Sequence, residues 1–322
     1  MAKMRGKPNR REFLKSAALG TTAGVVAMSL EEKALLAAKR GQTRSPSKTN
    51  ATGKMPMGKI GKLDISRIIC GGNLTSGFAH SRDLVYVSSL LKHYFTDEKI
   101  FETWRKCEES GVNTAILRLD SHVLRLTKEY WNKEGGKLQW IAQIKASDKN
   151  LTANAKKAID NGAVGVYVQG GVGDSLVGNN KVDVLGRFVE AAKKNGVIAG
   201  IGGHLHEVPV ACEKAGIKPD FYMKTLHSKK YWSAGHPKEH DNVWCKKADE
   251  TIEFMQKVEA PWIAFKVLAA GAISPTSGFK YALANGADFM CVGMFDFQVA
   301  EDVKILKGLF ARGIKRKRPW RG

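Results

Sequence analysis

The chain has 322 residues, of which 43% are hydrophobic, and a formal net charge of +21 at pH 7. This length supplies one large core or two modest ones. The five cysteines include no CxxC pair, which excludes a disulfide framework and predicts buried thiols. The charge excess is largely terminal, with eleven Lys or Arg against three Glu in residues 1–50 and six basic residues from Arg312 onward. Terminal basic runs are typical of solvated arms and no nucleic-acid-reading motif is present, so we expect no nucleic-acid partner.

The first 56 residues have the order of a targeting segment. Residues 9–15 read NRREFLK, an apolar stretch covers residues 16–30, and the charged EEKALLAAKR follows. The Arg10–Arg11 pair with Phe-Leu-Lys resembles a twin-arginine signal, which implies a bacterial protein delivered to the periplasm or otherwise exported by the twin-arginine machinery. We assign residues 1–40 to this signal and residues 41–56 to a polar linker; an ordinary amphipathic helix is the alternative. We expect no membrane span apart from an uncleaved signal anchor.

From there on, short apolar runs alternate with stretches of helical spacing. The predicted strands are 65–72, 112–119, 138–145, 163–170, 197–203, 219–226, 262–269 and 287–294. The predicted helices are 97–111, one ending at Trp131, 150–162, 181–196, a short one ending at Gly216, 248–258, 275–286 and one ending near Gly313. Six of them end in glycine, the residue that best tolerates a left-handed helix stop. Eight such units predict a single (β/α)8 TIM barrel over residues 57–313, with a basic tail over 314–322. A doubly wound open sheet is the alternative, which the lack of GxGxxG after the first strand disfavours.

Polar residues gather where a barrel performs its chemistry, at the carboxyl ends of the strands. All eight histidines fall between a predicted strand and its helix, and none lies inside a predicted helix. The stretch IAGIGGHLHEV places His204 and His206 two residues apart, so in extended backbone both face the barrel mouth. Imidazoles and carboxylates on neighbouring strand ends can hold a divalent ion. The predicted metal ligands are His204, His206, His227, His240 and Asp296.

Other side chains at the same end predict a substrate site. The candidate catalytic residues are Asp120, Lys145, Lys224 and Lys266. The candidate substrate-binding residues are Asn73, Gln169, Tyr231, Trp232, Gly271 and Gly293. The two aromatic-rich loops, about 72–96 and 227–245, suit walls that stack on a sugar-like substrate, or they pack over the barrel end. A lysine or aspartate here can equally be an ion-pair partner that holds a layer together.

The segment 57–73, followed by a helix and GVNTAI at 111–116, resembles the opening of aldo-keto reductases, which begin with a short hairpin. The resemblance implies a catalytic role for Lys145 and Asp120 with NAD(P) as cofactor. The chain departs from that family at Gln169, where the family has His, and it lacks a Tyr at the expected distance after Asp120.

Residues 265–295 resemble the last two units of aldolase-type, phosphate-binding barrels, whose Gly-rich loop presents backbone N–H groups to an anion. Residues 220–225 (DFYMKT) together with Lys266 resemble deoxyribose-phosphate aldolase, which implies a Schiff base on Lys224.

Four functions follow from these patterns. The first is an exported enzyme that acts on a small carbonyl or sugar-like substrate by metal-assisted or His/Lys acid–base chemistry, as a lyase, isomerase or hydrolase. The others are an aldo-keto-reductase-like oxidoreductase that uses NAD(P), a Schiff-base aldolase, and a non-catalytic exported binding protein. An unphosphorylated sugar or sugar acid is the favoured substrate, because few phosphorylated sugars occur outside the cytoplasm.

Overall fold

The computed structural model describes residues 53–78, 84–145, 147–231, 234 and 245–322. The chain divides into two units, Met1–Asn50 and Ala51–Gly322, and the predicted signal segment lies outside the described residues. Among the described residues, no helix combines the length and apolar composition that a membrane crossing requires.

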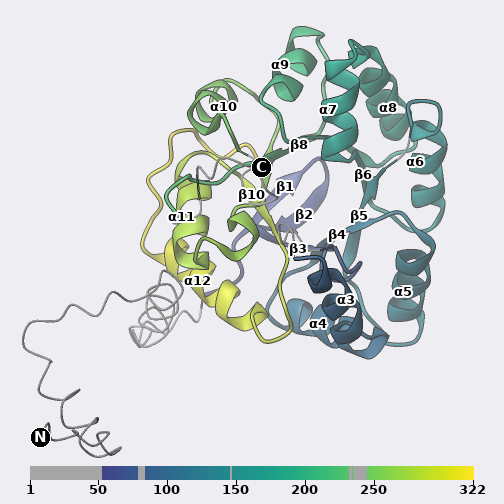
Figure 1. Ribbon diagram of the computed structural model, residues 1–322, viewed down its shortest axis with the longest axis vertical. Coiled ribbons are helices and arrows are strands. Elements are labelled where there is room, and N and C mark those ends of the chain that lie inside the picture. Colours follow the sequence, from purple (N-terminus) through teal and green to yellow (C-terminus); the bar gives the residue numbers. More distant parts are fainter. Residues whose placement is uncertain (1–52, 79–83, 146, 232–233, 235–244) are drawn as a thin grey trace, which may run out of the picture. The chain divides into compact units, whose positions relative to one another are not determined.

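Eight parallel strands form a closed barrel in the order β10-β3-β4-β5-β6-β7-β8-β9 (Figure 1). The strands are β3 Ile68–Gly71, β4 Thr114–Arg118, β5 Gln139–Ile144, β6 Gly165–Val168, β7 Ile198–Gly203, β8 Phe221–Thr225, β9 Trp262–Phe265 and β10 Phe289–Val292. The first and last strands pair directly, Met290 opposite Ile68, so the predicted (β/α)8 barrel is confirmed and the open-sheet alternative is wrong. Each of these strands lies within its predicted range.

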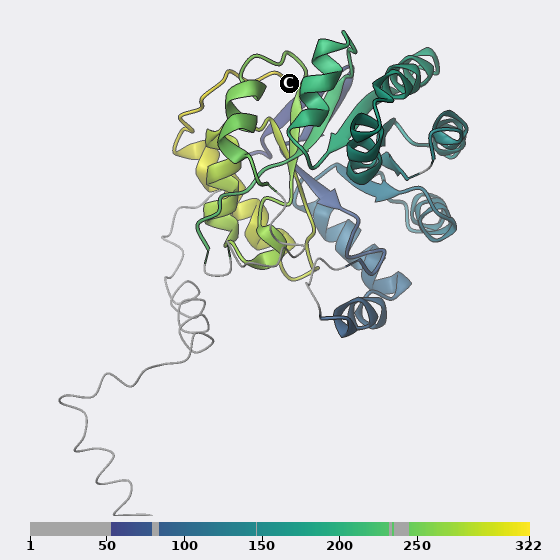
Figure 2. The same cartoon turned by 45° about the horizontal axis from the view of Figure 1, so that its top comes forward.

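Helices surround the barrel on all sides (Figures 1 and 2). They are α3 Tyr86–Tyr94, α4 Asp97–Glu109, α5 Ser121–Asn132, α6 Leu151–Asp160, α7 Gly170–Gly178, α8 Val182–Lys194, α9 Glu207–Lys214, α10 Ala248–Met255, α11 Pro275–Ala284 and α12 Val299–Ala311, with a 3-10 turn η1 at Ala269–Gly271. The six predicted stop glycines all have positive φ, from 71° to 108°, a backbone shape that other residues rarely adopt. Cys291 is half-buried and the other four cysteines are buried, all with free thiols.

An antiparallel hairpin, β1 Met57–Ile60 and β2 Leu63–Ser66, closes one end of the barrel. Ile60 and Ile65 are fully buried in the interior core together with Ile69, Ile198 and Phe289, which stand at or near the starts of their strands. The hairpin therefore covers the amino-terminal end, leaving the carboxyl ends as the mouth. Residues 65–72 were predicted as one strand, but they contain the end of β2, then Arg67, and then β3.

Two helices were not predicted. Helix α3 lies in the first long loop, and α7 stands between β6 and α8. Glycine has a low helix propensity, so the glycine-rich segment GGVGDSLVG of α7 was not predicted to be a helix. His93 lies in α3 and His122 in α5, so the expected placement of all eight histidines in strand-to-helix loops is wrong for these two.

The basic tail is not a solvated arm. Arg316 and Arg318, whose side chains are 6% and 1% exposed, reach the fully buried carboxylate of Asp288 at 3.0 and 3.4 Å. Trp320 stacks on Phe310 at 5.4 Å between ring centroids. The expectation from charge alone failed because an arginine stem can pack on apolar surface while its guanidinium pairs with a buried acid.

Candidate functional site

The barrel mouth contains a histidine–aspartate pair. Nδ1 of His204, just after β7, lies 2.7 Å from Oδ2 of Asp174 on α7. Oδ1 of the same carboxylate accepts the backbone N–H groups of His204 and Leu205 at 2.8 and 3.0 Å. The His204 ring packs against Phe265, which adjoins the interior core of the barrel. One carboxylate thus fixes both the backbone and the ring of His204 at the mouth, while 13% of the side chain stays exposed.

Glycines bring α7 close enough to β7 for this contact. A Cβ added at Gly173 would lie 2.0 Å from the carbonyl oxygen of Gly202, and one at Gly170 would lie 2.9 Å from Cε1 of His204. These positions lie one helical turn apart, so the same face of α7 rests on the strand end. Asp174 was missed from the sequence. The pattern GGVGD, small residues three apart before an acid, is the signal that could have found it.

His206 does not join His204. Strand β7 ends at Gly203, and the chain turns directly into α9, so the two histidines do not share a face. The ring of His206 meets α10 instead, edge-on to Phe254 at 5.7 Å and with Nδ1 3.4 Å from the hydroxyl of Thr251. Burial lowers the pKa of His206. The prediction that both histidines face the mouth is therefore wrong, because it required extended backbone beyond the glycine pair.

The other predicted metal ligands are also engaged elsewhere. His227 is fully buried, with Nδ1 3.0 Å from the Ser228 carbonyl and Nε2 accepting the Cys245 N–H at 3.0 Å. Burial lowers the pKa of His227. Asp296 accepts the Tyr94 hydroxyl at 2.5 Å. His240 lies outside the described residues. Within the described ranges, no three His, Cys, Asp or Glu side chains gather as a metal site would require.

Lys224 lies on the outer side of β8. Phe221 and Met223 face the barrel interior and Tyr222 faces the helices, so Lys224 faces the helices with it. Its ammonium donates to the His204 carbonyl at 2.8 Å, to Thr225 Oγ1 at 2.8 Å and to the Thr225 carbonyl at 3.2 Å. Burial lowers the pKa of Lys224, and its three N–H groups face three acceptors. The Schiff-base prediction for Lys224 is corrected, because this amine does not open into the mouth.

Asp120 caps a helix, and Lys266 lies in the bend that follows β9. The Asp120 carboxylate caps α5 by accepting the Val123 N–H at 2.9 Å and lies 3.8 Å from Arg118. Lys266 follows β9 with a left-handed φ of 58°, and Ala269 and Ala270 of η1 also have positive φ.

The predicted substrate-binding residues are spread around the mouth. The Asn73 carbonyl accepts the Phe78 N–H at 2.8 Å, and the Tyr231 ring lies 6.1 Å from that of His227. Gly271 ends η1, and Gly293 follows β10 beside Leu74. Trp232 lies outside the described residues.

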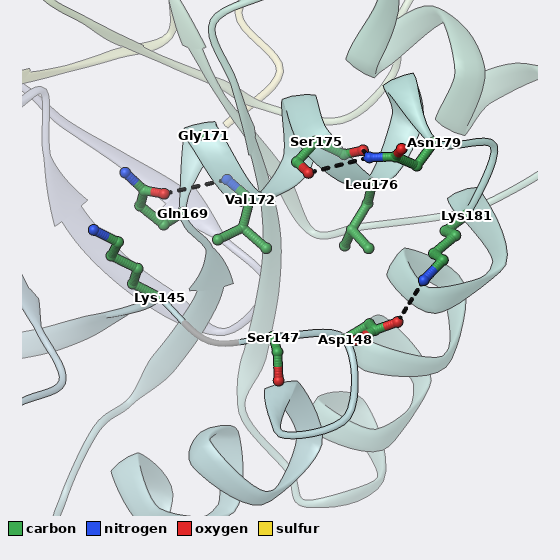
Figure 3. Close-up of a pocket in the computed structure, with 10 residues that line it drawn as sticks. All are labelled: Lys145, Ser147, Asp148, Gln169, Gly171, Val172, Ser175, Leu176, Asn179 and Lys181. Atoms are coloured by element: carbon green, nitrogen blue, oxygen red, sulfur yellow. Dashed lines mark hydrogen bonds and ion pairs between the residues drawn. The ribbon is translucent and has the colours of Figure 1, made fainter.

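A groove of about 550 Å³ opens beside α7 (Figure 3). Lys145 and Gln169, which follow β5 and β6, stand together at one end of it, and the ion pair of Asp148 with Lys181 stands at the other. Gln169 also caps α7, its Oε1 accepting the Val172 N–H at 3.2 Å. The structure therefore brings two predicted site residues, Lys145 and Gln169, next to the helix that holds His204.

The sequence matches no protein-family model and no curated protein. Several solved structures share its fold. An aldo-keto reductase from Bacillus halodurans in its holo form is 12% identical, with 78% of this chain and 91% of that chain covered and a TM-score of 0.54. A mutant of Gox0644 in complex with NADPH is 9% identical, with 79% and 89% covered and a TM-score of 0.52. A truncated 3-deoxy-D-arabino-heptulosonate 7-phosphate synthase from Thermotoga maritima is 15% identical, with 82% and 95% covered and a TM-score of 0.48. The chain thus has a TIM-barrel fold, with aldo-keto reductases among its structural neighbours; similarity at this level is one of fold.

Proposed function

We propose that this protein is an enzyme in which His204, held by Asp174, transfers a proton to and from a small carbonyl or sugar-like substrate at the barrel mouth. The observation that carries the proposal is the three-point hold of one carboxylate on the ring and backbone of His204. A general base must be oriented before it can act, and a carboxylate behind an imidazole provides that orientation.

The chemistry follows from the hydrogen bond. A carboxylate only accepts hydrogen bonds, so Nδ1 of His204 carries a proton toward Asp174 and Nε2 is where a proton is gained or lost. Nε2 takes a proton from the carbon next to the carbonyl, and the electron pair of the broken C–H bond moves onto the carbonyl oxygen. When the carbon that lost its proton carries a hydroxyl, the proton of that hydroxyl moves to the oxyanion; return of the proton from Nε2 to the former carbonyl carbon then leaves a carbonyl at the other position and gives the isomer. Its return to the carbon from which it came gives back the substrate.

A metal does not fit the described residues of the predicted ligand set. Both ring nitrogens of His227 face backbone partners, and His206 is turned toward α10. We derive no step through a metal for this site.

The exchange of hydrogen with solvent tests the proposal. Full-length protein is incubated in D2O with glyceraldehyde, dihydroxyacetone, D-glucose and D-glucuronate, and loss of the proton beside the carbonyl is followed by NMR. We expect catalysed exchange with one of these compounds, and a fall of about 10²- to 10⁴-fold in His204→Asn. His206→Asn, the matched control, keeps the wild-type rate because its ring faces α10. Absence of catalysed exchange, or equal rates in wild type and His204→Asn, would refute the proposal.

An NAD(P)-dependent reductase is the second candidate. It is favoured by the closing hairpin, by Lys145 at the end of β5 and by the likeness of fold to a mutant of Gox0644 solved with NADPH. The remaining residues do not fit the family pattern, because Asp120 caps α5 and Gln169 follows β6. Quenching of tryptophan fluorescence by NADPH at micromolar concentration, without exchange in D2O, would favour this candidate.

Export by the twin-arginine pathway is part of the proposal and is supported by the NRREFLK segment at residues 9–15. Export favours an unphosphorylated substrate and a reaction that needs no diffusible nicotinamide cofactor.

A further inference from the structure

The groove beside α7 has two walls, which come from different segments of the chain. Ser147 and Asp148 come from the loop that follows β5, whereas Val172, Ser175 and Leu176 come from α7 (Figure 3). With a volume of about 550 Å³, the groove is large enough for a six-carbon molecule.

Among the described residues that line the groove, Lys145 is the cation without an acidic partner. At the outer end, Lys181 and Asp148 neutralise one another at 2.8 Å. At the inner end, Lys145 is exposed and makes no hydrogen bond or ion pair with another described residue. An ammonium in this position attracts one negative group.

Neutral donors lie close to that ammonium. The Val172 N–H holds Oε1 of Gln169, which directs the Nε2 donors toward the side where Lys145 stands (Figure 3). Further along, the hydroxyl of Ser175 accepts from Nδ2 of Asn179 at 3.3 Å and retains its own proton for a ligand oxygen. The groove thus offers an anion position first and hydroxyl-binding positions after it.

The first turn of α7 joins this groove to the proposed catalytic histidine. Gln169 and Gly171 line the groove, and a Cβ added at Gly170 between them would lie 2.9 Å from Cε1 of His204. The inner end of the groove and the ring of His204 therefore both lie beside the first turn of α7.

We propose that the groove binds the acidic end of a polyhydroxylated carboxylic acid, with its carboxylate on Lys145 Nζ and Gln169 Nε2 and its hydroxyls along Ser175 and Asn179. This inference deepens the proposed function by naming its substrate class, and it rests on that function only for the chemistry that follows binding.

Binding is measured by calorimetry on the full-length protein with D-gluconate, which has the carboxylate and hydroxyls but no carbonyl. D-Glucose and inorganic phosphate are the comparison probes. We expect D-gluconate to bind with an affinity that falls as salt is raised, and D-glucose and phosphate to bind at least tenfold more weakly. Lys145→Met should weaken D-gluconate binding about tenfold, whereas Lys257→Met, which removes an exposed lysine beyond α10, should leave it unchanged.

The outcomes separate this inference from the proposed function. Equal D-gluconate affinity in wild type and Lys145→Met, or no binding at all, overturns the groove as an acid site. Phosphate binding as tight as D-gluconate shows an anion site without hydroxyl recognition and overturns the substrate class. D-Gluconate binding without catalysed exchange in D2O supports the groove and overturns the proton-transfer function. His204→Asn should retain D-gluconate affinity.

Discussion

At the scale of single residues, the partner of a side chain decides what it can do. His204 and His206 are two positions apart, yet one meets a carboxylate at the mouth and the other meets Phe254 and Thr251 on α10. Lys224 and Lys145 both stand at strand ends, yet one is 2% exposed and faces three acceptors while the other opens into a groove. Residue type and strand position identified the candidate site residues. Their neighbours from other elements determine which of them face the mouth or the groove.

A trapping experiment tests the orientation of Lys224. Full-length protein is treated with glyceraldehyde and borohydride and then mapped by mass spectrometry. We expect added mass on exposed lysines, with Lys145 as the internal control, and none on Lys224, because its buried ammonium is turned to the helices. Stoichiometric labelling of Lys224 would contradict the structure and restore the Schiff-base hypothesis.

At the scale of elements, α7 shows why a glycine-rich segment can be a helix. Its intrinsic propensity is poor, but its glycines allow backbone contact with β7 that larger residues would block. The packing gained at this contact outweighs the local preference. The same contact places Asp174 beside His204. The helix that was not predicted from the sequence therefore supplies a residue of the candidate site.

Two alanine substitutions within α7 test this contact. Gly173→Ala places a Cβ against the Gly202 carbonyl and should lower the free energy of unfolding by about 3 kcal/mol. Gly178→Ala, where no atom lies within 4 Å of the added Cβ, should change it by less than about 1 kcal/mol, in the stabilising direction. Urea titrations compare the two variants, and equal midpoints would show that α7 does not depend on this close approach.

Helix α12 carries an acid whose burial should make stability depend on pH. Asp302 is 3% exposed, and burial, followed by the charge of Glu301, raises its pKa to about 7. An unfolded Asp ionises near pH 4, so stability is fully present below that pH and falls as pH rises to about 7, by about 2–4 kcal/mol. Asp302→Asn should remove this loss in urea titrations at pH 5 and pH 8. The variant Asp160→Asn, which changes an exposed acid, should lose as much stability between pH 5 and pH 8 as the wild type. An equal loss in Asp302→Asn would show that Asp302 is solvated and contradict the prediction.

At the scale of the whole molecule, both chain ends of the barrel unit close its amino-terminal side. The hairpin contributes Ile60 and Ile65 to the interior core, and the tail brings Trp320 between the guanidinium groups of Arg67 and Arg316, at 4.2 and 3.4 Å from its ring. The Gly322 carbonyl accepts from Arg67 at 2.5 Å, and the chain end lies near the barrel axis (Figure 1). The strong positive charge of the tail is therefore part of the fold.

Removing the aromatic ring of the tail should destabilise the whole barrel. Trp320→Ala loses the stacking on Phe310 and two cation–π contacts, so we expect the free energy of unfolding to fall by about 2 kcal/mol. Lys317→Ala, an exposed neighbour, should stay within about 0.5 kcal/mol. Thermal unfolding of both variants measures the difference. A Trp320→Ala protein as stable as the wild type would contradict the packing of the tail and support its interpretation as a solvated arm.

The sequence by itself determined the barrel, because the strand and helix periodicity of eight units and the glycines that end six of the helices are local signals. It also pointed to the mouth and to His204, Lys145 and Gln169, since strand ends can be read along the chain. Only the tertiary structure decided which of these residues meet. The position of Asp174 beside His204, the close packing of α7 and the burial of the tail depend on contacts between segments far apart in the sequence. Local sequence patterns do not predict such contacts.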